Sequence, residues 1–458
     1  MTKKSRAVSM TEGAPLKLIL TFMAPVLLGQ LVQQTYNMVD AMIVGRILGA
    51  DALASVGASS SVQFMILGFV SGCSDGFAIN VAQRFGASDE SNMRRYEYHS
   101  YILAALFAFL IAVSGALLTP GIIGLLKTPD NIKENAITYL FIIFAGIPFT
   151  FMYNIQASVL RAIGNSRIPF IFLAISAGLN VILDLIFVWI FKWGVAGAAA
   201  ATVISQALSG IFCAVYIIKY ALILHPSKQE MKLRSGIFLK LIAMGVPMGL
   251  QFSITAIGSM VMQSGNNSLG SEYVSGYTAG DRVEQFVMCP YVALSSSVAT
   301  YVGQNYGALK FDRVRKGVKD SIVMAHIYGL IFGSLMALFG KNVAGLFLPS
   351  GSDDIVSIAG RFLWYVGFMF FLVSSVNVYR PAMQGMGKPM FAIVSGIIEM
   401  AARSLFVIST IKHLGYTTIC LTHQAAWVSA GIYVFIMYHI VVNRLEREVI
   451  AAGSHISC

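Results

Sequence analysis

Two aspartates in apolar surroundings are the residues of this sequence best suited to handle ions. Asp40 follows the polar but neutral residues Tyr36 and Asn37, and Asp184 follows Asn180 by one helical turn. Neither aspartate has a basic residue within one turn, so no partner nearby in the sequence neutralises either charge. A carboxylate inside an apolar stretch is costly, and such residues are by default candidates for ion or proton pathways.

Two kinds of chemistry follow if these aspartates converge. In surroundings of low dielectric, two neighbouring carboxylates can share one proton, because like charges resist ionising together. They can instead bind Na⁺ with oxygen atoms from Asn180 and from Thr202, which lies in the small-residue stretch GAAAATVISQ that allows close helix approach. The alternative is that Asp40 and Asp184 are two unrelated carboxylates at helix contacts.

A second group of ionisable residues lies in apolar stretches of the C-terminal half. Glu399 and Arg403 are four residues apart, so they share a helix face and can form an internal ion pair. Arg282 and Glu284 lie with Asp281 in GDRVEQF, where the three charges can neutralise one another. We treat Glu284, Arg282, Glu399 and Arg403 as secondary candidates for ion coupling.

The sequence contains no pattern for catalysis or nucleotide binding. The seven histidines are scattered and show no HExxH or paired-ligand spacing. There is no GxxxxGK[ST] loop to cradle the phosphates of ATP. We therefore expect no enzymatic activity and no cofactor, and the energy for any transport would come from a gradient of H⁺ or Na⁺.

The composition places these residues in a membrane protein. Of the 458 residues, 57% are hydrophobic and 12% are charged, and the mean hydropathy is +0.73. About a quarter of the residues of a soluble domain are charged, and half that share cannot cover a soluble particle of this size. A soluble enzyme, a disordered chain and a coiled coil are excluded. The net charge of +11 indicates basic cytoplasmic loops rather than binding of nucleic acid.

Apolar runs long enough to cross about 30 Å of hydrocarbon recur along the whole chain. They are continuous and lack a ten-residue alternation, which indicates α-helices rather than barrel strands. Glycines and prolines inside them are tolerated, and we expect Asp75, in GCSDGF, to cap a break made by glycines. The sequence predicts an all-α integral membrane protein with about twelve spans: 16–45, 52–83, 97–119, 136–160, 168–191, 194–220, 238–264, 273–304, 318–348, 355–385, 390–411 and 415–442.

The distribution of basic residues predicts the orientation of the chain. Of the 32 Lys and Arg residues, 23 lie in loops on one side of the predicted spans, 7 lie on the other side and 2 fall within spans. The side richer in Lys and Arg faces the cytoplasm. Both termini are therefore expected in the cytoplasm, in a multi-pass protein of the plasma membrane.

The chain also repeats itself on either side of its longest basic loop, HPSKQEMKLRSG at 225–236. From Leu48 to Ala87 the offset between the halves stays at 221 residues without a gap, through polar loop ends where chance matching of apolar helices would lose register. The matching pairs are Pro25 with Pro247, LGAD at 48–51 with LGSE at 269–272, and QRFGA at 83–87 with QNYGA at 304–308.

This repeat predicts the domain organisation. We expect an N-lobe at 1–224 with helices 1–6, a cytoplasmic inter-lobe loop at 225–236, and a C-lobe at 237–458 with helices 7–12. Six is an even number, so both halves insert the same way up. The two six-helix bundles are then related by a pseudo-two-fold axis along the membrane normal, an arrangement that suits alternating access.

The doubled pattern resembles the multidrug and toxic compound extrusion (MATE) family. RAIGNSRIP at 161–169 looks like that family's loop between its fourth and fifth helices, and QGMGKP at 384–389 looks like the C-terminal counterpart. The resemblance covers residues 15–443. It implies twelve helices in two lobes and antiport of organic, often cationic, compounds against H⁺ or Na⁺. We expect a monomer in the lipid bilayer that acts on small molecules and not on nucleic acid.

Within the family, the N-lobe residues are most similar to those of DinF-like and archaeal members. The resemblance implies a polar cluster for protonation or Na⁺ binding, formed by the first, fourth, fifth and sixth helices. The residues of this sequence that match it are Tyr36 and Asp40 in YNMVD, Asn154 in MYNIQASVL, Asn180 and Asp184 in GLNVILD, and Thr202.

The C-terminal half departs from the NorM-like branch of the family. Members of that branch carry a glutamate midway along the seventh helix, and the corresponding residue here is Thr255. Glu399 and Arg403 do not replace it. The alternative function is that of a lipid-linked oligosaccharide flippase of the same wider superfamily. Such flippases have a more basic cavity, whereas Arg282 and Arg403 are the only candidates for buried cations predicted here.

Overall fold

The computed structural model describes residues 7–126, 128–346 and 352–454, and most of them are helical. Eleven described helices are long and apolar enough to cross a membrane, and a pair bent by 50° raises this to twelve. The predicted all-α class and the number of spans are therefore confirmed. The helices are α1 Pro15–Leu48, α2 Ala50–Gly86, α3 Glu90–Leu125, α4 Asp130–Ala162, α5 Arg167–Asp184, α6 Val195–Tyr220, α7 Ser235–Asn267, α8 Ser271–Gly307, α9 Phe311–Gly345, α10 Asp353–Phe368, α11 Val373–Gly385, α12 Pro389–Leu414 and α13 Tyr416–Ser454.

Local sequence explains several helix ends. Asp89 caps α3, since its carboxylate accepts a hydrogen bond of 3.2 Å from the Asn92 backbone N–H. Pro389 opens α12, where a missing N–H costs nothing. The tenth predicted span, 355–385, is the bent pair: α10 ends at Phe368 and a short 3₁₀ turn, Phe370–Leu372, leads into α11.

The internal repeat is visible in the backbone of the turns. Left-handed residues, which favour glycine because a Cβ is strained there, recur at corresponding turns of the two halves. Three of the four pairs are separated by the same 221 residues that relate the sequence motifs. The pairs are Gly49 and Gly270, Ser88 and Leu309, Gly194 and Gly415, and Gly164 and Gly387.

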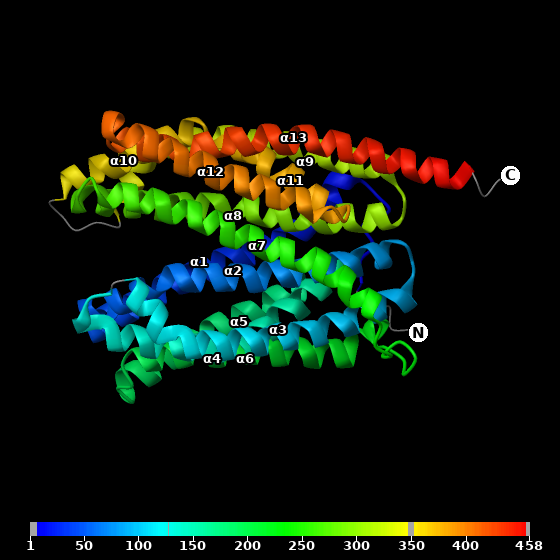
Figure 1. The fold of residues 1–458 in the computed structure, drawn as a ribbon, viewed down its shortest axis with the longest axis horizontal. Coiled ribbons are helices and arrows are strands. Elements are labelled where there is room, and N and C mark those ends of the chain that lie inside the picture. Colours follow the sequence, from blue (N-terminus) through cyan, green and yellow to red (C-terminus); the bar gives the residue numbers. More distant parts are fainter. Residues whose placement is uncertain (1–6, 127, 347–351, 455–458) are drawn as a thin grey trace. The chain divides into compact units, whose positions relative to one another are not determined.

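The chain forms two compact units. Among the described residues, the first unit contains residues 7–9 and 24–249, and the second contains Met10–Met23 and residues from Leu250 to Ser454. Within each unit the long helices lie side by side along their lengths (Figure 1). The lobes 1–224 and 237–458 were defined by the matching sequence motifs of the two halves, whereas the two units are defined by which residues contact one another. The start of α1 therefore belongs to the second unit and the first half of α7 to the first.

Glycines hold the first half of α7 against α2 within the first unit. A Cβ on Gly72 would lie 2.6 Å from the Met248 carbonyl oxygen, and a Cβ on Gly76 would lie 2.6 Å from the Gly245 Cα. On the other side of the crossing, a Cβ on Gly249 would lie 2.8 Å from the Cys73 Sγ. Both helices thus present a GxxxG pattern to each other, a spacing that lets backbones approach closely in lipid.

Hydrogen bonds hold the segment before α1 in the second unit. The Asn305 side chain and the Arg313 guanidinium each donate to the Met10 carbonyl at 3.1 Å, and Arg313 also donates to the Gly13 carbonyl at 2.8 Å. Gln304 accepts from the Met10 backbone N–H at 2.8 Å. The repeated motif QNYGA therefore has a structural role here, since its Gln304 and Asn305 bind the backbone of Met10.

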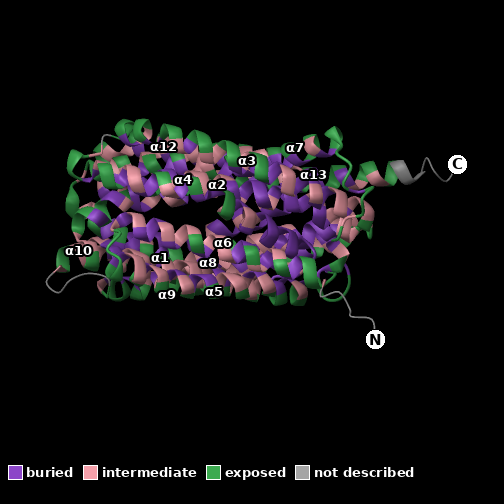
Figure 2. Cartoon of the chain, turned by 90° about the horizontal axis from the view of Figure 1, so that it is seen from below, coloured by how far each residue is buried: buried purple, intermediate pink, exposed green. Residues whose placement is uncertain are grey.

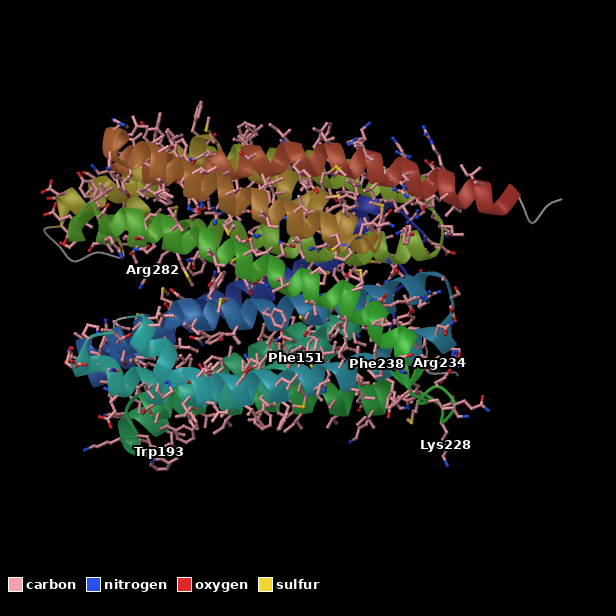
Figure 3. The ribbon with its side chains drawn as sticks, in the orientation of Figure 1. Phe151, Trp193, Lys228, Arg234, Phe238 and Arg282 are labelled. Carbon is pink, nitrogen blue, oxygen red and sulfur yellow. The ribbon has the colours of Figure 1, made fainter. Side chains whose placement is uncertain are left out.

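Ionic contacts fix the basic loop at one end of the first unit. Arg94 of α3 donates through Nε and Nη2 to the two oxygens of Glu230, both at 3.0 Å. His99 accepts from the Arg234 backbone N–H at 3.0 Å through its Nε2. Figure 3 shows Lys228 and Arg234 at this end of the unit and Trp193 at the opposite end.

The structure corrects the expectation for Asp75. Helix α2 runs without a break from Ala50 to Gly86, so Asp75 caps nothing. Its Oδ1 accepts hydrogen bonds from Ser158 at 2.6 Å and from Arg161 at 3.0 Å, both on α4. The glycines around Asp75 serve close packing instead of a break, which the sequence alone did not distinguish.

Exposed apolar residues cover the outer helix faces. Exposed residues lie on the outer faces of the helices, and buried residues lie where the helices pack against one another (Figure 2). Large side chains on these faces include Leu117, Ile218 and Leu338, each more than 60% exposed. Such a surface suits lipid as the surrounding solvent.

Candidate functional site

Asp40 and Asp184 meet inside the first unit. The carboxyl group of Asp40 on α1 and that of Asp184, the last residue of α5, lie close enough to interact directly. Asp184 is fully buried, and Asp40 is half-buried. Each Oδ1 atom is buried without a hydrogen-bond partner among the described residues. The convergence on which the sequence argument depended is therefore present in the structure.

Asn180 links this pair to α6. With its amide oriented to satisfy both groups, Asn180 donates to the Asp184 Oδ2 at 3.2 Å and accepts from the Thr202 backbone N–H at 3.3 Å. One helical turn separates Asn180 from Asp184, so both side chains lie on the same face of α5. Thr202 thus enters the cluster through its backbone N–H in this arrangement.

Two tyrosines surround the carboxyl groups. Tyr36 on α1 and Tyr139 on α4 both lie within electrostatic reach of Asp40 and Asp184. Tyr139 also interacts with the side chain of Gln63 on α2. The sequence predicts Tyr36 in this cluster but not Tyr139, because nothing in the local spacing of α4 indicates which face meets α1.

A small cavity adjoins the cluster. Its volume is about 10 Å³, roughly the space that one water molecule needs. Two of its polar atoms, the Ser205 Oγ and the Gln206 Oε1, are buried without a hydrogen-bond partner in the described chain. The lining residues are Tyr36, Leu173, Ser176, Ala177, Asn180, Thr202, Ser205 and Gln206.

Asn154 of α4 makes its contacts elsewhere. Its Oδ1 accepts from the Ser71 hydroxyl of α2 at 3.1 Å, and its Nδ2 donates to the Thr150 carbonyl at 2.8 Å. The hydrogen bonds described for Asn154 therefore tie α4 to α2 and do not reach Asp40 or Asp184.

The helix that carries Asp184 changes geometry directly after it. α5 ends at Asp184 and continues as a π-helical turn, Leu185–Ile190, in which the Phe191 N–H bonds to the Ile186 carbonyl at 2.9 Å. Gly197 of α6 faces this turn, and a Cβ there would lie 3.1 Å from the Phe187 backbone. π-Helical turns occur frequently at functional sites, and this one begins at the buried carboxylate.

Glu399 and Arg403 form the predicted internal pair, but with a third member. Arg403 donates to the Glu399 Oε1 at 2.8 Å, and Arg380 of α11 donates to the Glu399 Oε2 at 2.7 Å. Ser259 and Ser395 accept one further hydrogen bond each from these arginines. One carboxylate thus serves two guanidinium groups in the second unit.

The list of buried cations predicted from the sequence is therefore corrected. Arg282 is exposed on α8, so its charge is not buried (Figure 3). Arg380 is only 12% exposed and lies within α11, inside the predicted span 355–385, although only Arg282 and Arg403 were expected as buried cations.

Glu284 has a partner that the sequence did not indicate. Its Oε1 lies 3.6 Å from the Nδ1 of His423 on α13; Glu284 is buried, and the His423 side chain is 12% exposed. Asp281 accepts a hydrogen bond of 2.6 Å from Gln285. The expected mutual neutralisation within GDRVEQF is thus replaced, for Glu284, by a contact with a histidine far away in the sequence.

Comparison with known proteins identifies the class of protein that this fold and site define. The family model MatE matches residues 25–186 and 247–407, one match in each half of the chain. The chain belongs to the MatE family of membrane transporters.

Relatives and solved structures agree with this assignment. The chain is 30% identical over 395 residues to "Probable multidrug resistance protein YpnP" of Bacillus subtilis, with 86% of this chain and 88% of the relative covered. It is 22% identical to "Multidrug export protein MepA" of Staphylococcus haemolyticus, over 95% of this chain and 96% of the relative. Its fold is similar to a structure described as the outward-facing conformation of a multidrug resistance MATE family transporter of the MOP superfamily, with a TM-score of 0.89, 23% identity and coverage of 97% of this chain and 100% of that chain.

A further structural neighbour carries a different description. It is a MOP superfamily transporter from Pyrococcus furiosus described as having a binding pocket of reversed polarity, which suggests a different function for that protein. The TM-score is 0.90 at 22% identity, over 97% of this chain and 99% of that chain. At this level of identity the two similarities establish the fold alone.

Proposed function

We propose that this protein is a secondary active exporter of organic, often cationic, compounds and that it exchanges them for H⁺ or Na⁺ by alternating access. The names of its relatives, which describe multidrug resistance or multidrug export, support this substrate class. In this proposal the protein lies in the plasma membrane as a monomer with both termini in the cytoplasm. The N-lobe residues follow the pattern of DinF-like members.

The observation that carries the proposal is the direct approach of the Asp40 and Asp184 carboxyl groups inside the first unit. Two ionised carboxylates repel each other and both are only acceptors, so a pair this close favours binding of one proton or of a cation. The pair has no basic partner among its described contacts and keeps two unpartnered oxygens. The site can therefore hold a proton, or it can release the proton and offer carboxylate oxygens to Na⁺.

The exchange follows from competition for negative charge. With the ion bound, the Asp40 and Asp184 pair is neutralised, and its attraction for a cationic compound is lost. In the proposed cycle, ion binding from outside changes the packing of α1 around its internal Pro25 and releases the substrate. A ligand drives such a change only by its different affinities for the two conformations.

The test is efflux of ethidium from cells that express single variants. We expect Asp40→Asn and Asp184→Asn each to abolish efflux while the proteins remain inserted and folded. Asp51→Asn, which changes an exposed aspartate at the start of α2, is the matched control and should leave efflux unchanged. Efflux at the wild-type level from both site variants would refute the assignment of these residues.

Two further arms of the same assay separate the open alternatives. A protonophore should stop efflux if H⁺ is the coupling ion, and a series of Na⁺ concentrations should change its rate if Na⁺ is. A flippase for lipid-linked oligosaccharides would export no ethidium under either condition.

A further inference from the structure

The contact between Glu284 and His423 in the second unit is not used by the function proposed above. Helices α8 and α13 bring the Glu284 Oε1 and the His423 Nδ1 to 3.6 Å, with the side chains 5% and 12% exposed. The outer atoms, Glu284 Oε2 and His423 Nε2, are buried without a hydrogen-bond partner in the described chain. Buried polar atoms are nearly always paired, so this pair has unused capacity to bind a ligand.

We propose that Glu284 and His423 form a second proton-binding site of this transporter, an inference that rests on the proposed exchange of substrate for ions. The ligand is H⁺ itself, which adds to a lone pair of the imidazole or the carboxylate and leaves from the same atom. No other reactant is needed. A proton also needs no cavity, so a tightly packed site between α8 and α13 can bind it.

The charges around the pair favour a site that changes its protonation state. Asp281 of α8 and Arg403 of α12 act electrostatically on Glu284, and Arg403 also acts on His423. Two further titratable groups of this cluster are Tyr277 of α8 and Tyr416 of α13. The carboxylate is therefore between one negative and one positive neighbour, and neither of them is bonded to it.

Those two neighbours already have partners of their own. Asp281 is bound by Gln285 at 2.6 Å, and Arg403 is bound to Glu399 at 2.8 Å. Helices α9, α10 and α11 also pack against α8 or α13. In the described part of the chain, none of them contributes a principal charge that acts on the pair, and Arg380 of α11 is bound to Glu399. His423 is thus the group left to exchange a proton with Glu284.

The surroundings of His423 select a proton over Na⁺. The imidazole lies between two aromatic rings, Phe362 at 6.0 Å and Trp427 at 5.6 Å between ring centroids. Both rings are buried and approach the imidazole nearly edge-on. A hard cation such as Na⁺ needs several oxygen ligands, whereas His423 and the two rings beside it offer only one ring nitrogen and apolar carbon atoms.

The first test measures protonation without any substrate. In protein labelled with ¹⁵N-histidine, the His423 resonance is assigned by its loss in His423→Gln and followed from pH 5 to pH 9. We expect it to titrate, with a midpoint that Glu284→Gln shifts. The exposed His413 at the end of α12 is the control, and Glu284→Gln should leave its titration unchanged. A His423 resonance that is constant over the whole range would overturn the proposal.

The second test counts protons during binding of ethidium to purified transporter in weak buffer. We expect wild-type protein to release two protons and either Glu284→Gln or His423→Gln to release one, while His413→Gln behaves as wild type. If Asp40→Asn releases one proton fewer than wild type and Glu284→Gln releases as many as wild type, this inference fails and the proposed function stands. If Asp40→Asn releases as many protons as wild type and also exports ethidium normally, the proposed function fails. Thermal unfolding of each variant identifies any that does not fold. The double variant Glu284→Gln/His423→Gln should release as many protons as either single variant, because both residues belong to one site.

Discussion

A Cβ added to Gly76 of α2 would lie 2.6 Å from the Cα of Gly245 on α7. The backbones of these two helices are therefore in direct contact, and the first half of α7 is held in the first unit by atoms that any side chain would displace. Apolar side chains gain little from mutual contact in lipid, so such close backbone packing is a main source of helix association there.

We predict that Gly76→Val separates α2 from α7 and destabilises the protein by about 1–3 kcal/mol or more, the usual range for overpacking. The measurement is thermal unfolding of the purified transporter in detergent. Gly57→Ala on the same helix is the control, since its Cβ would meet nothing within 4 Å. That change should be neutral or stabilising by up to about 1 kcal/mol, because alanine favours a helix over glycine. Equal stability of the two variants would contradict the close contact.

A second prediction concerns the carboxylate shared by Arg380 and Arg403. Glu399→Gln leaves two buried guanidinium groups without their counter-charge, and removal of one partner from a buried ion pair costs about 3–5 kcal/mol. We expect a large drop in thermal stability. Glu272→Gln, at the exposed start of α8, should change stability by less than about 0.5 kcal/mol. A small effect at Glu399 would show that water reaches the arginines.

The helices were predictable because lipid imposes a simple rule on the sequence. Continuous apolar runs and glycine-rich turns mark every span, and the repeat fixes corresponding turns such as those at Gly49 and Gly270. The 50° bend between α10 and α11 was not predictable in the same way, since its sequence, Phe368 to Leu372, is as apolar as the helices around it.

The loop that follows α6 should respond to acid. Hydrogen bonds from Arg94 lower the pKa of Glu230 from its usual value of 4.5 to about 2. A lowered pKa means that the ionised group stabilises the loop above about pH 4.5, and that this stabilisation is lost as the pH falls toward 2. We expect pepsin to cleave the loop of Glu230→Gln readily at pH 4, where the wild-type loop is protected. The two proteins should become alike near pH 2, and identical cleavage at pH 4 would refute this prediction.

The last prediction tests how Asn180 positions the ion site. Asn180→Leu removes the donor to Asp184, and a hydrogen bond to a charged group contributes about 1.5–3 kcal/mol. The ionised form of Asp184 then becomes less stable relative to its neutral form, so the site holds its proton more tightly. We expect the pH of half-maximal ethidium efflux to rise by about one to two pH units, at 1.36 kcal/mol for each unit.

The exposed Asn131→Leu at the start of α4 provides the comparison for this experiment and should leave the pH profile in place. If Na⁺ is the coupling ion, the Asn180 variant loses an oxygen ligand instead. The Na⁺ concentration for half-maximal efflux should then rise while the pH profile changes little. Unchanged dependence on both ions would remove Asn180 from the site.

The candidate site was only partly predictable for a physical reason. Asp40 and Asp184 stand out because a charge in an apolar run is costly whatever it contacts. The identity of a partner on another helix depends on helix rotation, which one sequence does not reveal. Tyr139 and His423 were missed for that reason, and so was the burial of Arg380, which lies inside the predicted span 355–385.

The π-helical turn after Asp184 has a consequence for the register of the chain. Each residue of an α-helix advances the rotation by about 100°, so the widened turn at Leu185–Ile190 sets the direction of the residues within it and after it. Among them are Phe187 and Trp193, whose rings stack at 4.8 Å, and the exposed Trp189. A single-residue deletion in this turn would restore regular winding and rotate these rings about the helix axis. Trp189 and Trp193, of a residue type that is enriched at membrane interfaces, would then point in other directions, while Asp184 and the residues before it stay where they are.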